Sequence, residues 1–160
     1  MDDTWYRLIS KRINDETTLL NKYRGDYIRN DSIDGYVNAH NTSLFTNIVK
    51  QFFTNKFLLE LNGLKETTYF ICSDCGIRVG TGGDKFQRCH TLSRGKILKE
   101  ALINLNFGKG EYNISTYDVI KEFLLLHAKY PLKIKCVGCH KAETSSNDRI
   151  IVDNNSYVVD

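Results

Sequence analysis

Four of the five cysteines fall into two Cys-x-x-Cys pairs, "CSDC" at 72–75 and "CVGC" at 136–139. Each pair can present two sulfur atoms to one ion, and two pairs complete a tetrahedral set of four. Thiolate sulfur suits Zn²⁺ and excludes Mg²⁺ and Ca²⁺. Because four protein ligands close the coordination shell, the spacing predicts a structural zinc site; the alternative is reduced cysteines packed as small hydrophobic residues. The predicted ligands are Cys72, Cys75, Cys136 and Cys139.

The fifth cysteine, Cys89, precedes His90 in the basic stretch "FQRCHTLSRG" between the two pairs. An imidazole titrates near neutral pH, so His90 can act as a general base on water. Arg88, Arg94 and Lys96 flank it and can pair with phosphate oxygens. We expect Cys89 to face the core, because successive strand residues point to opposite sides. The alternative for His90 is a structural histidine that hydrogen-bonds a ligand sulfur.

Positive charge gathers around the two cysteine pairs, although the net charge is only +3. Residues 1–34 carry six basic and seven acidic side chains, whereas residues 72–100 carry six basic and three acidic ones. Residues 129–141 hold four lysines and no acid. This pattern favours a polyanionic partner over a merely solvated basic face. The residues predicted to contact such a partner are Arg78, Lys85, Arg88, Arg94, Lys96, Lys135 and Lys141.

Length and composition indicate one soluble globular domain. The chain has 160 residues, of which 41% are hydrophobic and 26% charged. No apolar run approaches the roughly 20 residues of a membrane span, and the first residues lack a signal-peptide pattern. We therefore expect an intracellular protein, cytoplasmic or nuclear, with no membrane partner. Inside a cell, paired cysteines are metal ligands more often than they form disulfides.

The N-terminal region, residues 1–66, is predicted to be helical. Apolar residues recur at helical spacing over residues 5–13 and again over 44–53, and Gly63 is expected to end the second helix. The Asn- and Asp-rich stretch at 29–41 is expected to be a loop. We expect this region to serve core packing, a dimer contact or a DNA-binding arm.

Strands and helices alternate in the rest of the chain. "TTYFIC" predicts a strand running into Cys72, and "RVGTGGDKFQRCH" a hairpin with a glycine turn. Residues 96–107 predict a helix that stops at Gly108. A capping pair, Ser115 and Asp118, predicts a further helix that ends before Pro131. "LKIKC" predicts a strand into the second cysteine pair, and the tail "RIIVDNNSYVV" a second hairpin.

In this order the elements resemble the HNH (ββα-metal, His-Me finger) endonuclease family. The matching parts are the first knuckle, a hairpin whose strand ends in "FQRCH", and a second knuckle that opens a helix and is followed by histidine, "CVGCH". "CHTLSRG" is similar to the His-x-x-Ser-Arg stretch of several phage and viral members. The resemblance covers about 67–150 and implies an α+β fold, with a ββα-metal core held by the zinc site. Flanking and inserted α-helices complete it, with a nuclease core at 67–160 and an insertion at about 96–130.

The resemblance implies a metal-dependent DNA endonuclease that hydrolyses phosphodiester bonds. His90 would be the general base, and His140 would hold a catalytic Mg²⁺ or Mn²⁺. Cys89 stands where members often carry a second ligand, so Glu143 and Asp84 are candidates for that role. A small enzyme of this type, cutting both strands at specific sites like a restriction enzyme, would act as a homodimer.

Two other functions fit parts of the pattern. A non-catalytic zinc module that binds nucleic acid, such as a transcription or packaging factor, uses the same zinc and the same basic segments. It has no need of two imidazoles, His90 and His140, meeting across a groove. A zinc-stabilised protein-interaction domain would leave the basic segments unexplained.

Overall fold

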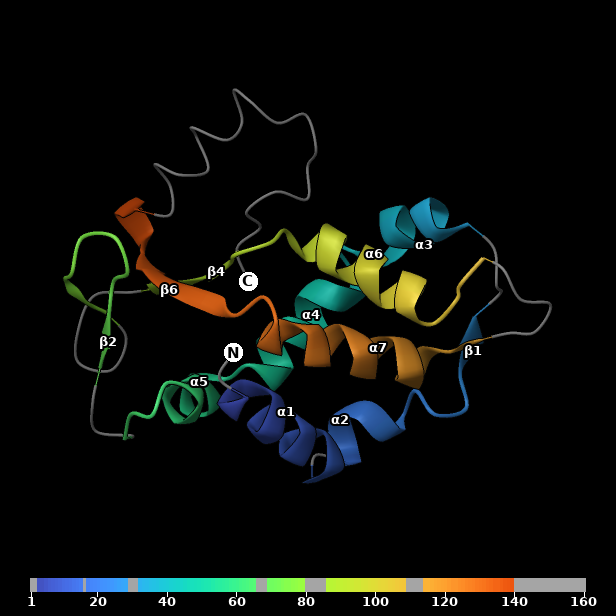
Figure 1. Ribbon diagram of the computed structural model, residues 1–160, viewed down its shortest axis with the longest axis horizontal. Coiled ribbons are helices and arrows are strands. Elements are labelled where there is room, and N and C mark those ends of the chain that lie inside the picture. The colour runs from blue at the N-terminus through green and yellow to red at the C-terminus, as the bar shows by residue number, and fades with distance from the viewer. Residues whose placement is uncertain are drawn as a thin grey trace.

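Helices make up most of the described chain, and three small antiparallel sheets accompany them. The computed structural model describes residues 3–15, 17–28, 32–65, 69–79, 86–108 and 114–139. In Figure 1, strands β2, β4 and β6 gather at one end of the molecule, and the helices form the body beside them. The fold is therefore a mixture of helices and small sheets, as the predicted α+β class requires.

The elements follow one another with short connections. The helices are α1 (Thr4–Asp15), α2 (Thr17–Asn21), α3 (Ile33–His40), α4 (Leu44–Phe52), α5 (Asn55–Leu61), α6 (Arg94–Asn104), α7 (Thr116–Leu125) and the 3-10 helix η1 (Leu126–Ala128). The strands are β1 (Tyr27–Ile28), β2 (Phe70–Ile71), β3 (Arg78–Val79), β4 (Phe86–His90), β5 (Ile114–Ser115) and β6 (Leu132–Cys136). The antiparallel pairs are β1 with β5, β2 with β3 and β4 with β6.

One hydrophobic cluster runs through the described residues, from Ile9 in α1 to Cys136 at the end of β6. Helix α4 shows why it forms, because its buried residues Phe45, Ile48, Val49 and Phe52 recur at helical spacing and line one face. Aromatic rings meet across helices at this face; those of Phe45 and Phe123 lie 4.8 Å apart in an edge-on contact. The helices therefore pack around aromatic side chains supplied by distant parts of the chain.

The predicted loop at 29–41 is wrong over most of its length, because residues 33–40 form α3. Ser32 caps the helix, and its hydroxyl accepts a hydrogen bond from the Gly35 amide at 3.1 Å. Tyr36 and Val37 are buried against the core. A cap and two buried anchors thus outweigh the low helix propensity of the neighbouring Asn, Asp and Gly residues.

The second predicted helix is divided in two. Helix α4 ends at Phe52, and α5 starts after Thr54, whose hydroxyl accepts a hydrogen bond from the Phe57 amide at 3.2 Å. Gly63 does end α5 as predicted: it has φ of +71°, and the Leu64 amide donates to the Leu59 carbonyl at 2.8 Å. This is the left-handed glycine termination that only a residue without a Cβ adopts at little cost.

The helices of the second half keep their predicted places with shifted ends. Helix α6 starts earlier than expected, after Ser93, whose hydroxyl accepts from the Lys96 amide at 3.3 Å. It ends at Asn104, earlier than predicted, and both Asn106 and Gly108 after it have left-handed φ values, of 59° and 87°. Helix α7 begins after Ser115 and ends before Pro131, as predicted, but the Ser115 side chain makes no capping bond.

Strand pairing differs from the predicted hairpin at 78–90. Strand β3 pairs with β2, and β4 pairs with β6 in the register Phe86 with Cys136 and His90 with Leu132. The glycine turn lies outside the described residues, as does the hairpin predicted for the tail. The strand predicted from "LKIKC" is confirmed as β6.

No helix in the described parts of the chain is long and apolar enough to cross a membrane.

His127 is fully buried among aromatic rings. Its ring centroid lies 4.9 Å from those of Phe53 and Phe123 and 5.3 Å from that of His90. Its Nδ1 lies 2.9 Å from the Phe123 carbonyl, which can only accept, so Nδ1 carries the proton. Burial lowers the pKa of His127 to about 4, because a charged imidazole would lose its hydration there.

We predict that His127 makes the protein sensitive to mild acid. Its pKa is about 4 in the fold and about 6.5 in the unfolded chain, so the unfolded state binds more protons between these values. The stabilisation is complete above pH 6.5 and is lost as the pH falls towards 4. Urea unfolding measures the free energy of unfolding at pH 7.5 and at pH 5. Between these two values it should fall by about 2 kcal/mol less in His127→Phe than in the parent. An equal loss in both proteins would contradict this assignment.

Candidate metal centre

The four paired cysteines come together in one cluster, which confirms that part of the prediction. Their sulfur atoms all lie within 4.8 Å of one another, and the sulfurs of Cys75 and Cys136 are 3.7 Å apart. A tetrahedron with Zn–S bonds of about 2.3 Å has sulfur–sulfur edges of about 3.8 Å. The cluster could therefore hold a metal ion such as zinc. The cysteines are Cys72, Cys75, Cys136 and Cys139.

Backbone hydrogen bonds shape the first knuckle. The Gly76 amide donates to the Cys72 carbonyl at 3.0 Å, and the Cys72 amide donates to the Ile77 carbonyl at 2.9 Å. Gly76 has φ of +80°, the left-handed conformation that glycine adopts without a steric cost. This turn brings Cys72, which is buried, and Cys75, which is exposed, to the same ion position. The glycine directly after "CSDC" is thus part of the site.

Two polar contacts join the first knuckle to β6, which leads into the second. The Ser73 amide donates to the Ile134 carbonyl at 3.0 Å. The Lys135 ammonium lies 3.2 Å from the Asp74 carboxylate, and only 7% of the Lys135 side chain is exposed. A cation withdrawn from water is stabilised by such a partner, so this pair helps fix the distance between the knuckles. Asp74 is a site residue that the sequence reasoning missed.

The cysteines of the cluster differ in the pKa of their thiols. Burial alone would raise the pKa of Cys72, but backbone hydrogen bonds at Cys75, Cys136 and Asp74 lower it to about 6. The neighbouring sulfurs of Cys136 and Cys75 raise the pKa of Cys139 far above its usual range. One thiolate therefore forms readily, and its negative charge opposes ionisation of the next thiol. A divalent cation would relieve the repulsion between the thiolates.

His90, the predicted general base, lies in the core. It is 1% exposed, and its ring meets that of the buried His127. A base that activates water on a phosphodiester must be reached by both the water and the phosphate. The described conformation keeps both away from this imidazole.

His90 also lies far from the second knuckle along the β4–β6 ladder. It pairs with Leu132, whereas Cys136 pairs with Phe86 at the other end. Four residue steps at about 3.3 Å each separate the two ends by about 13 Å.

Cys89 is buried, with 1% of its surface exposed, and it is not a member of the sulfur cluster. The expectation that it faces the core is therefore confirmed. Both faces of β4 are covered at this end, because His90, which points to the opposite side, is buried as well. Cys89 thus lies in the core as a small buried side chain.

The predicted DNA-contacting residues divide into surface and interior groups. Arg78 and Lys96 are exposed, and Arg88 is half-buried, with Nη1 lying 3.4 Å from Asn55 Oδ1. Arg94 is 1% exposed and donates from Nε to Asn41 Oδ1 at 3.1 Å, so it joins α6 to the segment after α3. Lys135 is withdrawn into its ion pair with Asp74. Lys133 is exposed as well, although its sequence context does not single it out as a contact.

Five predicted site residues lie outside the described part of the chain. They are His140, Glu143, Asp84, Lys85 and Lys141. Cys139, the last described residue, directly precedes His140.

Comparison with protein-family models, with curated proteins and with solved structures found no match. The resemblance to HNH endonucleases therefore rests on the quoted motifs alone.

We predict that the protein binds one zinc ion per chain through the cysteine cluster. Cys72→Ser and Cys136→Ser should each lose most of the bound zinc and unfold at lower temperature, because a missing thiolate opens the shell. Cys89→Ala is the matched control, since Cys89 is equally buried but outside the cluster. Metal content measured by mass spectrometry should stay unchanged in that control. Full zinc occupancy in both serine variants would contradict the assignment.

Proposed function

We propose that this protein is a zinc-containing nucleic-acid-binding module whose binding surface surrounds the cysteine cluster. The observation that carries this proposal is the convergence of the two knuckles, whose sulfurs lie within 4.8 Å of one another. Their convergence brings together the basic segments 72–100 and 129–141, which lie far apart in the sequence. A transcription or packaging factor is the kind of protein that this describes.

Exposed cations lie on the strands that flank the knuckles and on the helix that follows β4. Arg78 follows the first knuckle on β3, and Lys133 lies on β6 just before the second. Lys96 is exposed on the first turn of α6. Such side chains attract phosphates at long range and release counterions on binding, which gives affinity without sequence information. DNA is accordingly the expected partner.

A metal-dependent DNA endonuclease of the HNH type is the second candidate. Strand β4 ends in His90 and pairs with β6, which leads into helical residues 137–139, and this strand–strand–helix order favours a ββα-metal core. Such an enzyme would use His140, with Glu143 or Asp84, to hold Mg²⁺ or Mn²⁺, and would cut specific sites as a homodimer. The burial of His90 ranks this function below binding.

We predict salt-dependent binding that depends on the exposed cations of the two basic segments. Lys133→Gln and Lys96→Gln should each lower the slope of log affinity against log salt by about 0.9, because each removes one phosphate contact. Lys22→Gln is the matched control, since Lys22 is exposed and directly follows α2, which lies well apart from β2 and β6 in Figure 1. Fluorescence anisotropy with a labelled duplex, at several salt concentrations, measures the slopes. Equal slopes in all three variants would place the binding surface elsewhere.

Plasmid cleavage separates the two candidates. We predict that the zinc-loaded protein shifts supercoiled plasmid on a gel and leaves it intact in Mg²⁺ or Mn²⁺, because His90 is closed off from water. If the parent nicks or linearises the plasmid and a zinc-loaded His90→Ala variant does not, the endonuclease becomes the better assignment. Discrete fragments would then indicate sequence specificity.

A further inference from the structure

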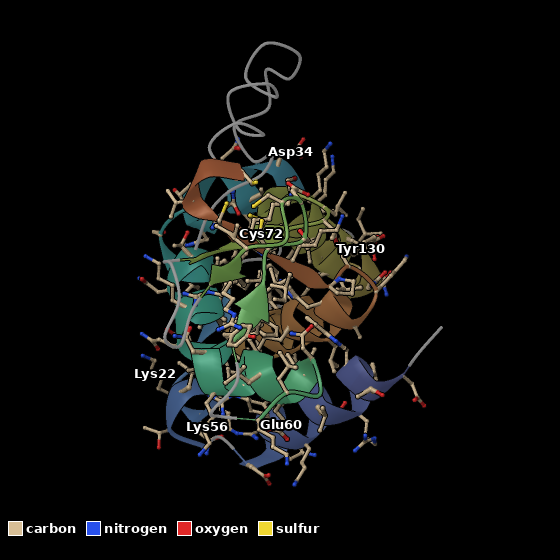
Figure 2. The ribbon with its side chains drawn as sticks, turned by 90° about the vertical axis from the view of Figure 1, so that its left-hand side faces the viewer. Lys22, Asp34, Lys56, Glu60, Cys72 and Tyr130 are labelled. Carbon is tan, nitrogen blue, oxygen red and sulfur yellow. The ribbon has the colours of Figure 1, made fainter. Side chains whose placement is uncertain are left out.

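The β2–β3 ribbon has one buried and one exposed face. Phe70 and Val79 pair across the two strands and are buried, at 2% and 0% exposure. Ile71 and Arg78 form the next pair and are both exposed, with Ile71 at 54%. Directly paired residues share one face, so the exposed face carries an aliphatic side chain beside a guanidinium. In Figure 2 this ribbon lies at the front of the molecule, next to Cys72.

An aromatic ring extends this face. The guanidinium carbon of Arg78 lies 4.2 Å from the centroid of the Tyr69 ring, a cation–π contact. Tyr69 is half-buried, and it precedes Ile71 by two residues, the strand spacing that returns to the same side. We call Tyr69, Ile71 and Arg78 the ribbon face. Its aromatic and guanidinium groups are held together before any partner arrives.

Exposed apolar side chains continue from the ribbon face onto the knuckles. Ile77 is 41% exposed and lies two residues after Cys75, and Val137 is 42% exposed and lies directly after Cys136. The shared sulfur cluster keeps these two segments together. Within the described residues, three of the six exposed large hydrophobic side chains therefore adjoin the cluster. Apolar surface gathered in this way marks an interaction site.

We infer that the ribbon face binds unpaired bases of single-stranded nucleic acid; this inference rests on the proposed nucleic-acid binding. A duplex would present its phosphates to the ribbon face. Its bases are stacked inside the double helix, where Tyr69 and Ile71 cannot reach them. A single strand presents phosphates and bare base faces together, and it is recognised by cations interleaved with aromatic side chains. Arg78 combines both functions, because a guanidinium can stack on a ring and pair with a phosphate.

The test compares labelled dT20, rU20 and a mixed-sequence duplex by fluorescence anisotropy at one salt concentration. The variants are Tyr69→Leu and Ile71→Thr, chosen to remove the ring and the aliphatic side chain without changing charge. Their matched controls are Tyr27→Leu and Ile103→Thr, since Tyr27 is 62% and Ile103 52% exposed on other elements. Zinc content and circular dichroism establish that each protein is folded. The two single strands distinguish DNA from RNA as the source of the bases.

The expected result is tighter binding of a single strand than of the duplex. Tyr69→Leu and Ile71→Thr should weaken single-strand binding about fivefold or more, while duplex affinity stays within about twofold. If the parent binds nucleic acid but these variants match their controls, or weaken duplex binding equally, the inference is overturned and the proposed function stands. If the parent binds none of the three probes, both fail.

Discussion

This structure depends on the contact between four cysteine sulfurs, which come from two distant segments of the chain. Cys75 and Cys136, for example, are sixty-one residues apart in the sequence. The strands around them form three sheets of only two strands each. Two-stranded ribbons have little stability of their own in water. A cross-link between them therefore contributes more to the stability of the fold than it would in a large sheet. A metal ion held by the cluster would thus keep β2, β3 and β6 together, and the helical core lies to one side of them.

Hydrogen bonds and charge prepare this meeting before any ion binds. The Ser73–Ile134 backbone bond and the Lys135–Asp74 ion pair hold the first knuckle against β6. The low pKa of Cys72 supplies one thiolate, and the neighbouring sulfurs oppose further ionisation. Such a preformed site lowers the cost of ordering the ligands. Parts of the two basic segments meet here as a consequence, and nucleic-acid binding is the use that we propose for them.

Local spacing could predict the parts that depend on local chemistry. The two Cys-x-x-Cys pairs, the strand before Cys136 and the glycine that ends α5 all follow from rules that act within a few residues. The division between α4 and α5, and the helix at 33–40, depend on caps at Thr54 and Ser32 combined with tertiary burial. The burial of His90 and Arg94 depends on residues that the fold brings to them from elsewhere in the chain. His90 contacts His127 and Arg94 contacts Asn41, and no spacing within one stretch of sequence indicates these contacts.

Binding of a labelled oligonucleotide before and after zinc removal tests the central claim most directly. The zinc-loaded protein should bind at low salt, lose that binding when a chelator extracts the ion, and regain it when zinc is restored, because the ion holds the two basic segments together. Undiminished binding by the metal-free protein, or no binding by the zinc-loaded protein, would contradict the account.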